Sequence, residues 1–97
     1  MKIYLHQQVK IEGDPFPHYW RKEIKNDIIP RKGDSIEDSL WKDPGEYEVI
    51  DITLNYQEDF CYVYLCQYKH EIPNNRKDEF KKIASSHGWT CSWNMYN

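Results

Sequence analysis

Apolar and polar residues alternate along several stretches of this chain, and each such stretch predicts a β-strand. The first stretch covers residues 2–11, where only Gln7 interrupts the apolar face. The apolar members of that face are Ile3, Leu5, Val9 and Ile11. Alternation with a period of two is typical of a strand that buries one side. Residues 12–17 contain two prolines and a Gly-Asp pair, and they predict a loop.

Two longer stretches each predict a strand. Residues 46–56 alternate as a long strand. One face carries Glu48, Ile50, Ile52, Leu54 and Tyr56, and the other carries Tyr47, Val49, Asp51, Thr53 and Asn55. Residues 60–68 are apolar on both faces, which is typical of a central strand.

Residues 18–29 fit two interpretations. Trp20, Ile24 and Ile28 recur every four residues, which suits one face of a helix and equally one face of a strand. The proline that follows disfavours helical geometry at Ile29. The preceding Gly-Asp-Pro-Phe-Pro sequence resembles a hairpin connection. We therefore favour a strand over a helix for this segment.

Proline and glycine placement predicts two turns. In residues 30–34 the leading proline fixes φ, and Gly33 accepts a positive φ at little cost. Residues 43–46 (Asp-Pro-Gly-Glu) match a type II turn, with proline second and glycine third. A short strand or an extended segment over residues 36–41 is expected between the two turns.

The hydrophobic period changes near the end of the chain. Phe80, Ile83, Ala84 and His87 recur at helical spacing, which predicts an amphipathic helix over Arg76–His87. Asn74 and Asn75 suit its N-cap, and Gly88 suits the position after its end. Residues 89–93 alternate again as a last strand.

These elements predict an α+β fold. We expect a small, bent antiparallel sheet of five or six strands, barrel-like, with one C-terminal helix. With 97 residues, the chain is expected to form one domain spanning residues 1–97. Aromatic residues make up 15% of the chain, so the core must be rich in rings.

Net charge and cysteine content indicate which partners and which cellular compartment suit the chain. A formal net charge of −3 offers no bulk attraction to nucleic acid or to an anionic membrane. No apolar run approaches the ~20 residues that span a bilayer, and no apolar block follows Met1, so we expect neither a membrane segment nor a signal peptide. Three cysteines argue against a closed disulfide framework, and free thiols predict the reducing cytoplasm.

The sequence carries no catalytic motif. Cys61 and Cys66 are five residues apart and would point to opposite faces of a straight strand, which disfavours a shared metal. The four histidines are scattered, and the four glycines form no phosphate loop. We therefore expect no catalytic residues, no metal and no cofactor, with cysteines and histidines in structural roles.

One cluster of basic and aromatic residues is a candidate binding site. Residues 18–22 (His-Tyr-Trp-Arg-Lys) lie near Arg31 and Lys32 in the sequence. Such aromatics can stack on bases while the cations meet phosphates, but acidic neighbours dilute the charge and disfavour nucleic acid. The candidate binding residues are Tyr19, Trp20, Arg31, Lys32 and Trp41.

A second candidate is an aromatic face within residues 60–68. Phe60, Tyr62, Tyr64, Cys66 and Tyr68 share one side of that stretch. An exposed face of this kind would suit a protein partner. A face covered by the helix would be core, and we favour that second interpretation.

Three segments carry a resemblance to a known group. Pro30-Arg31-Lys32-Gly33-Asp34-Ser35-Ile36, then residues 47–52 and residues 61–65, resemble small uncharacterised bacterial and phage-associated proteins. In those proteins a Pro-x-x-Gly-Asp turn leads into an SH3-like β-barrel, so the resemblance implies that fold. Bacterial toxin ribonucleases of the MazF/PemK type also place a Gly-Asp turn before a barrel strand. This chain lacks their subsequent substrate-binding and catalytic motif.

The sequence therefore favours a non-enzymatic protein-binding or adaptor domain. Weak nucleic-acid binding is the alternative, and a small ribonuclease-like enzyme comes third. An exposed aromatic patch would favour the first, a continuous positive stripe the second, and a cleft lined by polar residues the third.

Overall fold

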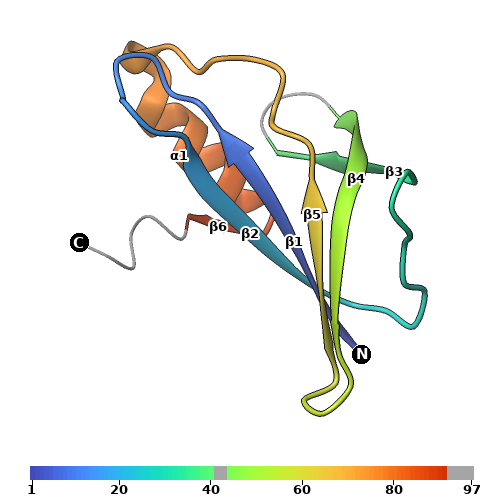
Figure 1. The fold of residues 1–97 in the computed structure, drawn as a ribbon. Helices are drawn as coiled ribbons and strands as arrows, with labels where there is room; N and C mark the ends of the chain where they lie inside the picture. The colour runs from blue at the N-terminus through green and yellow to red at the C-terminus, as the bar shows by residue number, and fades with distance from the viewer. Residues whose placement is uncertain (41–43, 92–97) are drawn as a thin grey trace.

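Six strands and one α-helix follow one another in the computed structural model, which describes residues 1–40 and 44–91. The strands are β1 (Lys2–Val9), β2 (His18–Lys25), β3 (Ser35–Ser39), β4 (Pro44–Asn55), β5 (Phe60–Leu65) and β6 (Trp89–Cys91). A 3₁₀ turn, η1 (Asn74–Arg76), leads into α1 (Lys77–Ser86). The strands form one sheet in the order β3-β4-β5-β1-β2-β6 (Figure 1). The expected α+β class with one C-terminal helix is confirmed.

The sheet is mixed, so the expectation of an entirely antiparallel sheet was wrong. β1 and β5 run parallel in its centre, with Ile3 opposite Cys61 and Leu5 opposite Val63. The other four pairings of named strands are antiparallel. Alternation specifies which face of a strand is apolar but not the direction of its neighbour. The central strand predicted over residues 60–68 is confirmed in its position, but it ends at Leu65.

A bulge at Ile50 bends β4. Val49 lies opposite Leu65 and Asp51 lies opposite Tyr64, which leaves Ile50 as an extra residue. A bulge of this kind bends its strand and increases the local twist. The sheet therefore curves into a half-barrel, and β3 crosses behind β4 in Figure 1.

The bulge also changes which residues of β4 share a face. A straight strand would place Tyr47 and Val49 opposite Ile52. In the structure all three point inward, because Val49 and Ile52 lie opposite the buried Leu65 and Val63. The prediction that Ile52 lies on the opposite face of the strand from Tyr47 and Val49 was therefore wrong.

The prediction of a turn at residues 43–46 was wrong for residues 44–46, while residue 43 lies outside the described residues. Pro44 and Gly45 belong to β4 and lie opposite Ser39 and Asp38. Gly45 does not adopt the positive φ that a type II turn requires at its third position. The turn at residues 30–34 is confirmed, with φ +96° at Gly33 and the Asp34 amide donating to the Arg31 carbonyl at 3.0 Å.

The ambiguous segment 18–29 is a strand over its first eight residues, as expected. β2 forms an antiparallel hairpin with β1, and Trp20 lies opposite Gln7. The strand ends at Lys25, so Ile28 does not continue its apolar face and is 79% exposed.

The helix begins one residue later and ends one residue earlier than expected. Its N-cap is Arg76, without a side-chain capping bond, so the expected asparagine cap was wrong. Asn74 instead donates from Nδ2 to the Glu12 carbonyl at 3.1 Å. Gly88 follows the helix with φ +90°, and its amide donates to the Ser85 carbonyl at 3.0 Å, as expected for a glycine in this position.

Candidate functional site

The helix covers only one side of the sheet. Phe80 of α1 meets Trp20 of β2, with ring centroids 5.3 Å apart. Alternation along β2 places Tyr19 and Arg21 on the other side from Trp20. On β1, Ile3 is buried on the helix side, which turns its neighbours along the strand away from α1. In the view of Figure 1, α1 lies behind β1 and β2.

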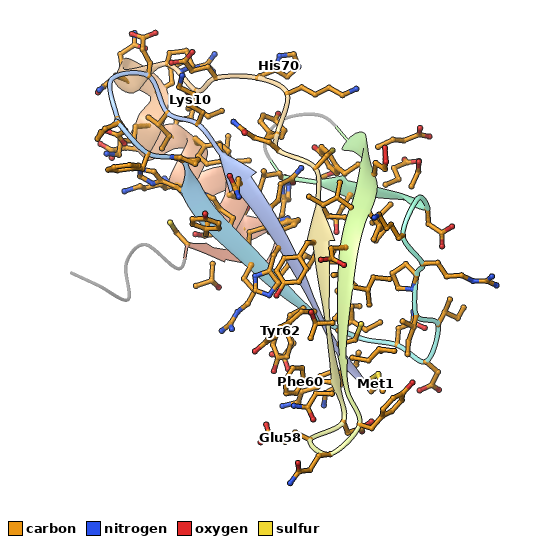
Figure 2. The ribbon with its side chains drawn as sticks, in the orientation of Figure 1. Met1, Lys10, Glu58, Phe60, Tyr62 and His70 are labelled. Atoms are coloured by element: carbon orange, nitrogen blue, oxygen red, sulfur yellow. The ribbon has the colours of Figure 1, made fainter. Side chains whose placement is uncertain are left out.

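The uncovered side carries a continuous aromatic cluster across β1 and β5. We call it the outer aromatic face; its members are Tyr4, His6, Phe60, Tyr62 and Tyr64. The parallel register brings these residues together, because Tyr4 lies opposite Tyr62 and His6 lies opposite Tyr64. Phe60 and Tyr62 lie beside one another near the lower end of β5 (Figure 2).

The rings contact one another in a network. The Tyr4 and Tyr62 centroids are 5.6 Å apart, edge to face. His6 stacks on Tyr64 at 5.2 Å and meets Tyr62 edge-on at 5.0 Å. Phe60 and Tyr62 are 4.7 Å apart. Each such pair contributes about 0.5–1.5 kcal/mol beyond area burial, so the rings hold one another in place, and each of them is half-buried.

Charged groups border these rings. The Arg21 guanidinium lies 5.1 Å from the Tyr4 centroid, in cation–π geometry. Burial, aided by the Arg21 charge, lowers the pKa of His6, so its imidazole is neutral at physiological pH. Lys2 and Glu23 form an exposed pair at 3.5 Å, which contributes little stability. The face is thus aromatic and uncharged at its centre, with the Arg21 cation held above the Tyr4 ring.

The candidate binding residues occupy separate parts of the fold. Tyr19 lies on the same side as the outer aromatic face and is 49% exposed. Trp20 is 2% exposed and belongs to the core. Arg31 and Lys32 are exposed in the turn before β3. Trp41 lies outside the described residues.

Sequence reasoning missed Tyr4 and His6, and it assigned the aromatic side of residues 60–68 to the core. That assignment was wrong for Phe60, Tyr62 and Tyr64, because α1 packs on the opposite side of the sheet. Tyr68 differs, since it follows β5 and packs against the core beside Tyr47. The sequence did contain one indication that Tyr4 and His6 face away from the core: both lie on the polar side of the first predicted strand.

A polar cluster, separate from the outer aromatic face, lies beside the N-terminal end of α1. The buried His18 bonds through Nε2 to the Asp14 carboxylate at 2.8 Å, and Lys77 approaches the same carboxylate oxygen at 3.5 Å. The His18 bond, aided by Lys77, holds the pKa of Asp14 below its usual value. This cluster ties the loop before β2 to the helix.

No group of three or more His, Cys, Asp or Glu side chains in residues 1–40 and 44–91 is placed to hold a metal ion. Cys61 and Cys91 are buried, and burial raises the pKa of the Cys61 thiol, which reduces its nucleophilicity. Among the helices in residues 1–40 and 44–91, none is long and apolar enough to cross a membrane.

Comparison of this chain with protein-family models, with curated proteins and with solved structures gave no match.

Proposed function

We propose that this protein is a non-enzymatic protein-binding domain that contacts its partner through the outer aromatic face. The supporting observation is the network of five half-buried rings on the side of the sheet that α1 leaves uncovered. Tyrosine and phenylalanine provide a large contact area at low entropy cost, because their side chains have only two rotatable torsions. Here ring–ring contacts have already restricted those torsions.

The chemistry of the face defines the partner. Its centre is aromatic and uncharged, since the pKa of His6 is lowered and its imidazole is neutral. Arg21 lies over Tyr4 at one side of this centre and can receive a carboxylate in a bidentate pair. We therefore propose a partner protein that presents an apolar surface beside an acidic side chain. Aromatic and arginine anchors at such a centre typically dominate the binding energy.

Site-specific photo-crosslinking in cells tests this proposal. A benzoyl-phenylalanine replaces Tyr62 in one variant and the exposed Lys82 of α1 in the control variant. We expect a discrete protein adduct from position 62 that is absent from position 82. Identical adducts at both positions, or none at position 62, would contradict the proposal.

The crosslinked partner is then purified and its affinity measured. Tyr62→Ala should weaken binding by at least about 30-fold, the effect of a hot spot worth ~2 kcal/mol. Lys82→Ala should leave the affinity unchanged. An unchanged affinity for a Tyr62→Ala protein with a normal thermal melt would also contradict the proposal.

Weak binding of nucleic acid is the alternative function. One observation favours it: Lys2 and Lys25 lie opposite each other on the uncovered side, near the Arg21–Tyr4 pair. Rings beside cations suit bases and phosphates respectively. The overall charge of −3 opposes it, and a ring network leaves fewer free faces for stacking.

We also propose that the half-barrel belongs to the SH3-like class and that the protein works in the cytoplasm. The first proposal rests on the turn at residues 30–34, followed by the antiparallel succession β3, β4 and β5. The second rests on the free thiols of Cys61 and Cys66, which suit a reducing compartment. The resemblance to bacterial and phage-associated proteins stays a prediction.

A further inference from the structure

An apolar groove opens on the inner side of the half-barrel, next to β3. Its volume is about 460 Å³. Aliphatic side chains from β1, β2, β3 and the segment before β3 line it, among them Ile3, Leu5, Ile24, Ile28, Ile29 and Ile36. Ile28 stands at the rim and is 79% exposed. The groove therefore offers a preformed site for aliphatic side chains.

Every second residue of β3 directs its backbone N–H and C=O groups away from β4. β3 is an edge strand, since it pairs only with β4. The Ser39 carbonyl accepts a bond from Trp89 Nε1 at 3.1 Å, so it faces away from β4. Residues two apart in an antiparallel strand direct their N–H and C=O groups the same way. Glu37 and Ser35 therefore present donors and acceptors on the unpaired edge.

Two contacts hold this edge in place at its far end. Lys22 donates from Nζ to both carboxylate oxygens of Asp38, at 3.0 and 3.1 Å. The Trp89–Ser39 bond adds a second link from β6. These contacts join β3 to the opposite end of the sheet, while the Ser35 end stays open beside the groove. The edge is thus rigid before any partner arrives, which lowers the entropy cost of binding.

The other side of β3 and β4 is acidic. Glu37 lies directly opposite Glu46, and Ser35 lies opposite Glu48. All three glutamates are exposed. No lysine or arginine among the described residues forms an ion pair with them. Like charges directly opposite one another are destabilising, so this row would gain from a cationic neighbour.

We propose that β3 binds an extended peptide segment of another protein, in which apolar and basic residues alternate. The segment adds as a strand along Ser35 and Glu37. Because successive side chains of a strand point to opposite faces, its apolar residues enter the groove while its basic residues meet the glutamate row. The groove, the unpaired edge and the acidic row all specify this same occupant.

A synthetic peptide tests the inference. The probe is a blocked heptapeptide that alternates lysine with valine, titrated into the ¹⁵N-labelled full chain. We expect saturable amide shifts centred on Ser35 and Glu37. A peptide with glutamate in place of lysine should bind at least about tenfold more weakly, because it meets like charges. Shifts centred on β1 and β5, or equal binding of both peptides, would overturn the proposal.

Two variants test the edge and the groove separately. Glu37→Pro removes an outward N–H without touching the β4 ladder, and Ile28→Ser removes an exposed groove residue. Each should weaken lysine–valine peptide binding about tenfold, whereas the remote Glu58→Gln should not. Glu37→Gln, which keeps the N–H, should give a smaller loss. Unchanged binding to both variants, with normal thermal melts, would overturn the proposal.

This inference goes beyond the proposed protein-binding role of the outer aromatic face and does not depend on it. Tyr62→Ala should leave the lysine–valine peptide affinity unchanged, because Tyr62 lies on the other side of the sheet from the groove. Each site can therefore fail its own test while the other passes.

Discussion

Phe80 of α1 stands edge to face against Trp20 of β2, with an interplanar angle of 82° and centroids 5.3 Å apart. Both side chains are almost fully buried, at 0% and 2% exposure. Their contact fixes the helix to one side of the sheet. It thereby decides that the rings of β1 and β5 on the opposite side remain accessible.

Phe80→Ala should lower the free energy of unfolding by about 3–5 kcal/mol, because it removes a buried ring and leaves a cavity beside Trp20. Urea unfolding followed by tryptophan fluorescence measures the loss. The matched control is Phe16→Ala, since Phe16 is 66% exposed and its loss should change stability by less than about 0.5 kcal/mol. Equal effects of the two substitutions would contradict the packing described.

Deletion of Ile50 should straighten β4. The remaining residues keep their faces, because the deletion restores simple alternation around Val49 and Asp51. Without the bend, β3 loses its links to Lys22 and Trp89, at a cost of roughly 2–4 kcal/mol. Chemical denaturation measures this cost, and the indole N–H resonance of Trp89 reports the broken bond. Ile50→Thr, which keeps the bulge, is the control and should preserve that resonance.

Asp14 should contribute stability that disappears in acid. Its pKa is lowered from 3.8 in the folded protein by the His18 bond and by Lys77, so the folded state favours the carboxylate. The contribution is present above about pH 4 and is lost as the pH falls through the folded-state pKa. Asp14→Ala should therefore cost about 1–3 kcal/mol at pH 6, and the difference from wild type should shrink toward pH 2. A difference that does not change with pH in urea unfolding would contradict this.

The three cysteines should differ in reactivity. Cys61 and Cys91 are 0% and 3% exposed, and burial raises the pKa of Cys61, so both should react slowly with a disulfide reagent. Cys66, which is half-buried, should react first. In urea all three should react rapidly. Elemental analysis should find no stoichiometric zinc. A structural role for the cysteines would be refuted by one zinc per chain, or by rapid reaction of all three thiols with the disulfide reagent in the native protein.

Oligonucleotides should not bind tightly. The chain has a net charge of −3, and Arg31 and Lys32 lie in a turn apart from Arg21. Non-specific binding requires several phosphate contacts and weakens steeply with salt. We expect no gel shift of single-stranded or duplex DNA at micromolar protein and near-physiological salt. A salt-sensitive complex weakened by Arg21→Ala would favour the nucleic-acid alternative.

The sequence by itself determined the local elements of this protein. Alternation over residues 2–11 predicted the first strand, which the structure ends at Val9, and the change to helical spacing from Phe80 to Ala84 predicted the helix. Gly33 and Gly88 marked places where the backbone needs a positive φ. These signals are local, because side-chain period and backbone sterics act over a few residues.

Only the tertiary structure decided how the elements meet. The parallel pairing of β1 with β5, the bulge at Ile50 and the side on which Phe80 docks depend on contacts between distant residues. The candidate sites depend on them too. Tyr4 and Tyr62 are neighbours only through that parallel register, and the groove beside β3 is lined by residues that lie far apart in the chain, such as Leu5 and Ile36. Local alternation carries no information about such partners, since the same pattern satisfies either strand direction and several registers.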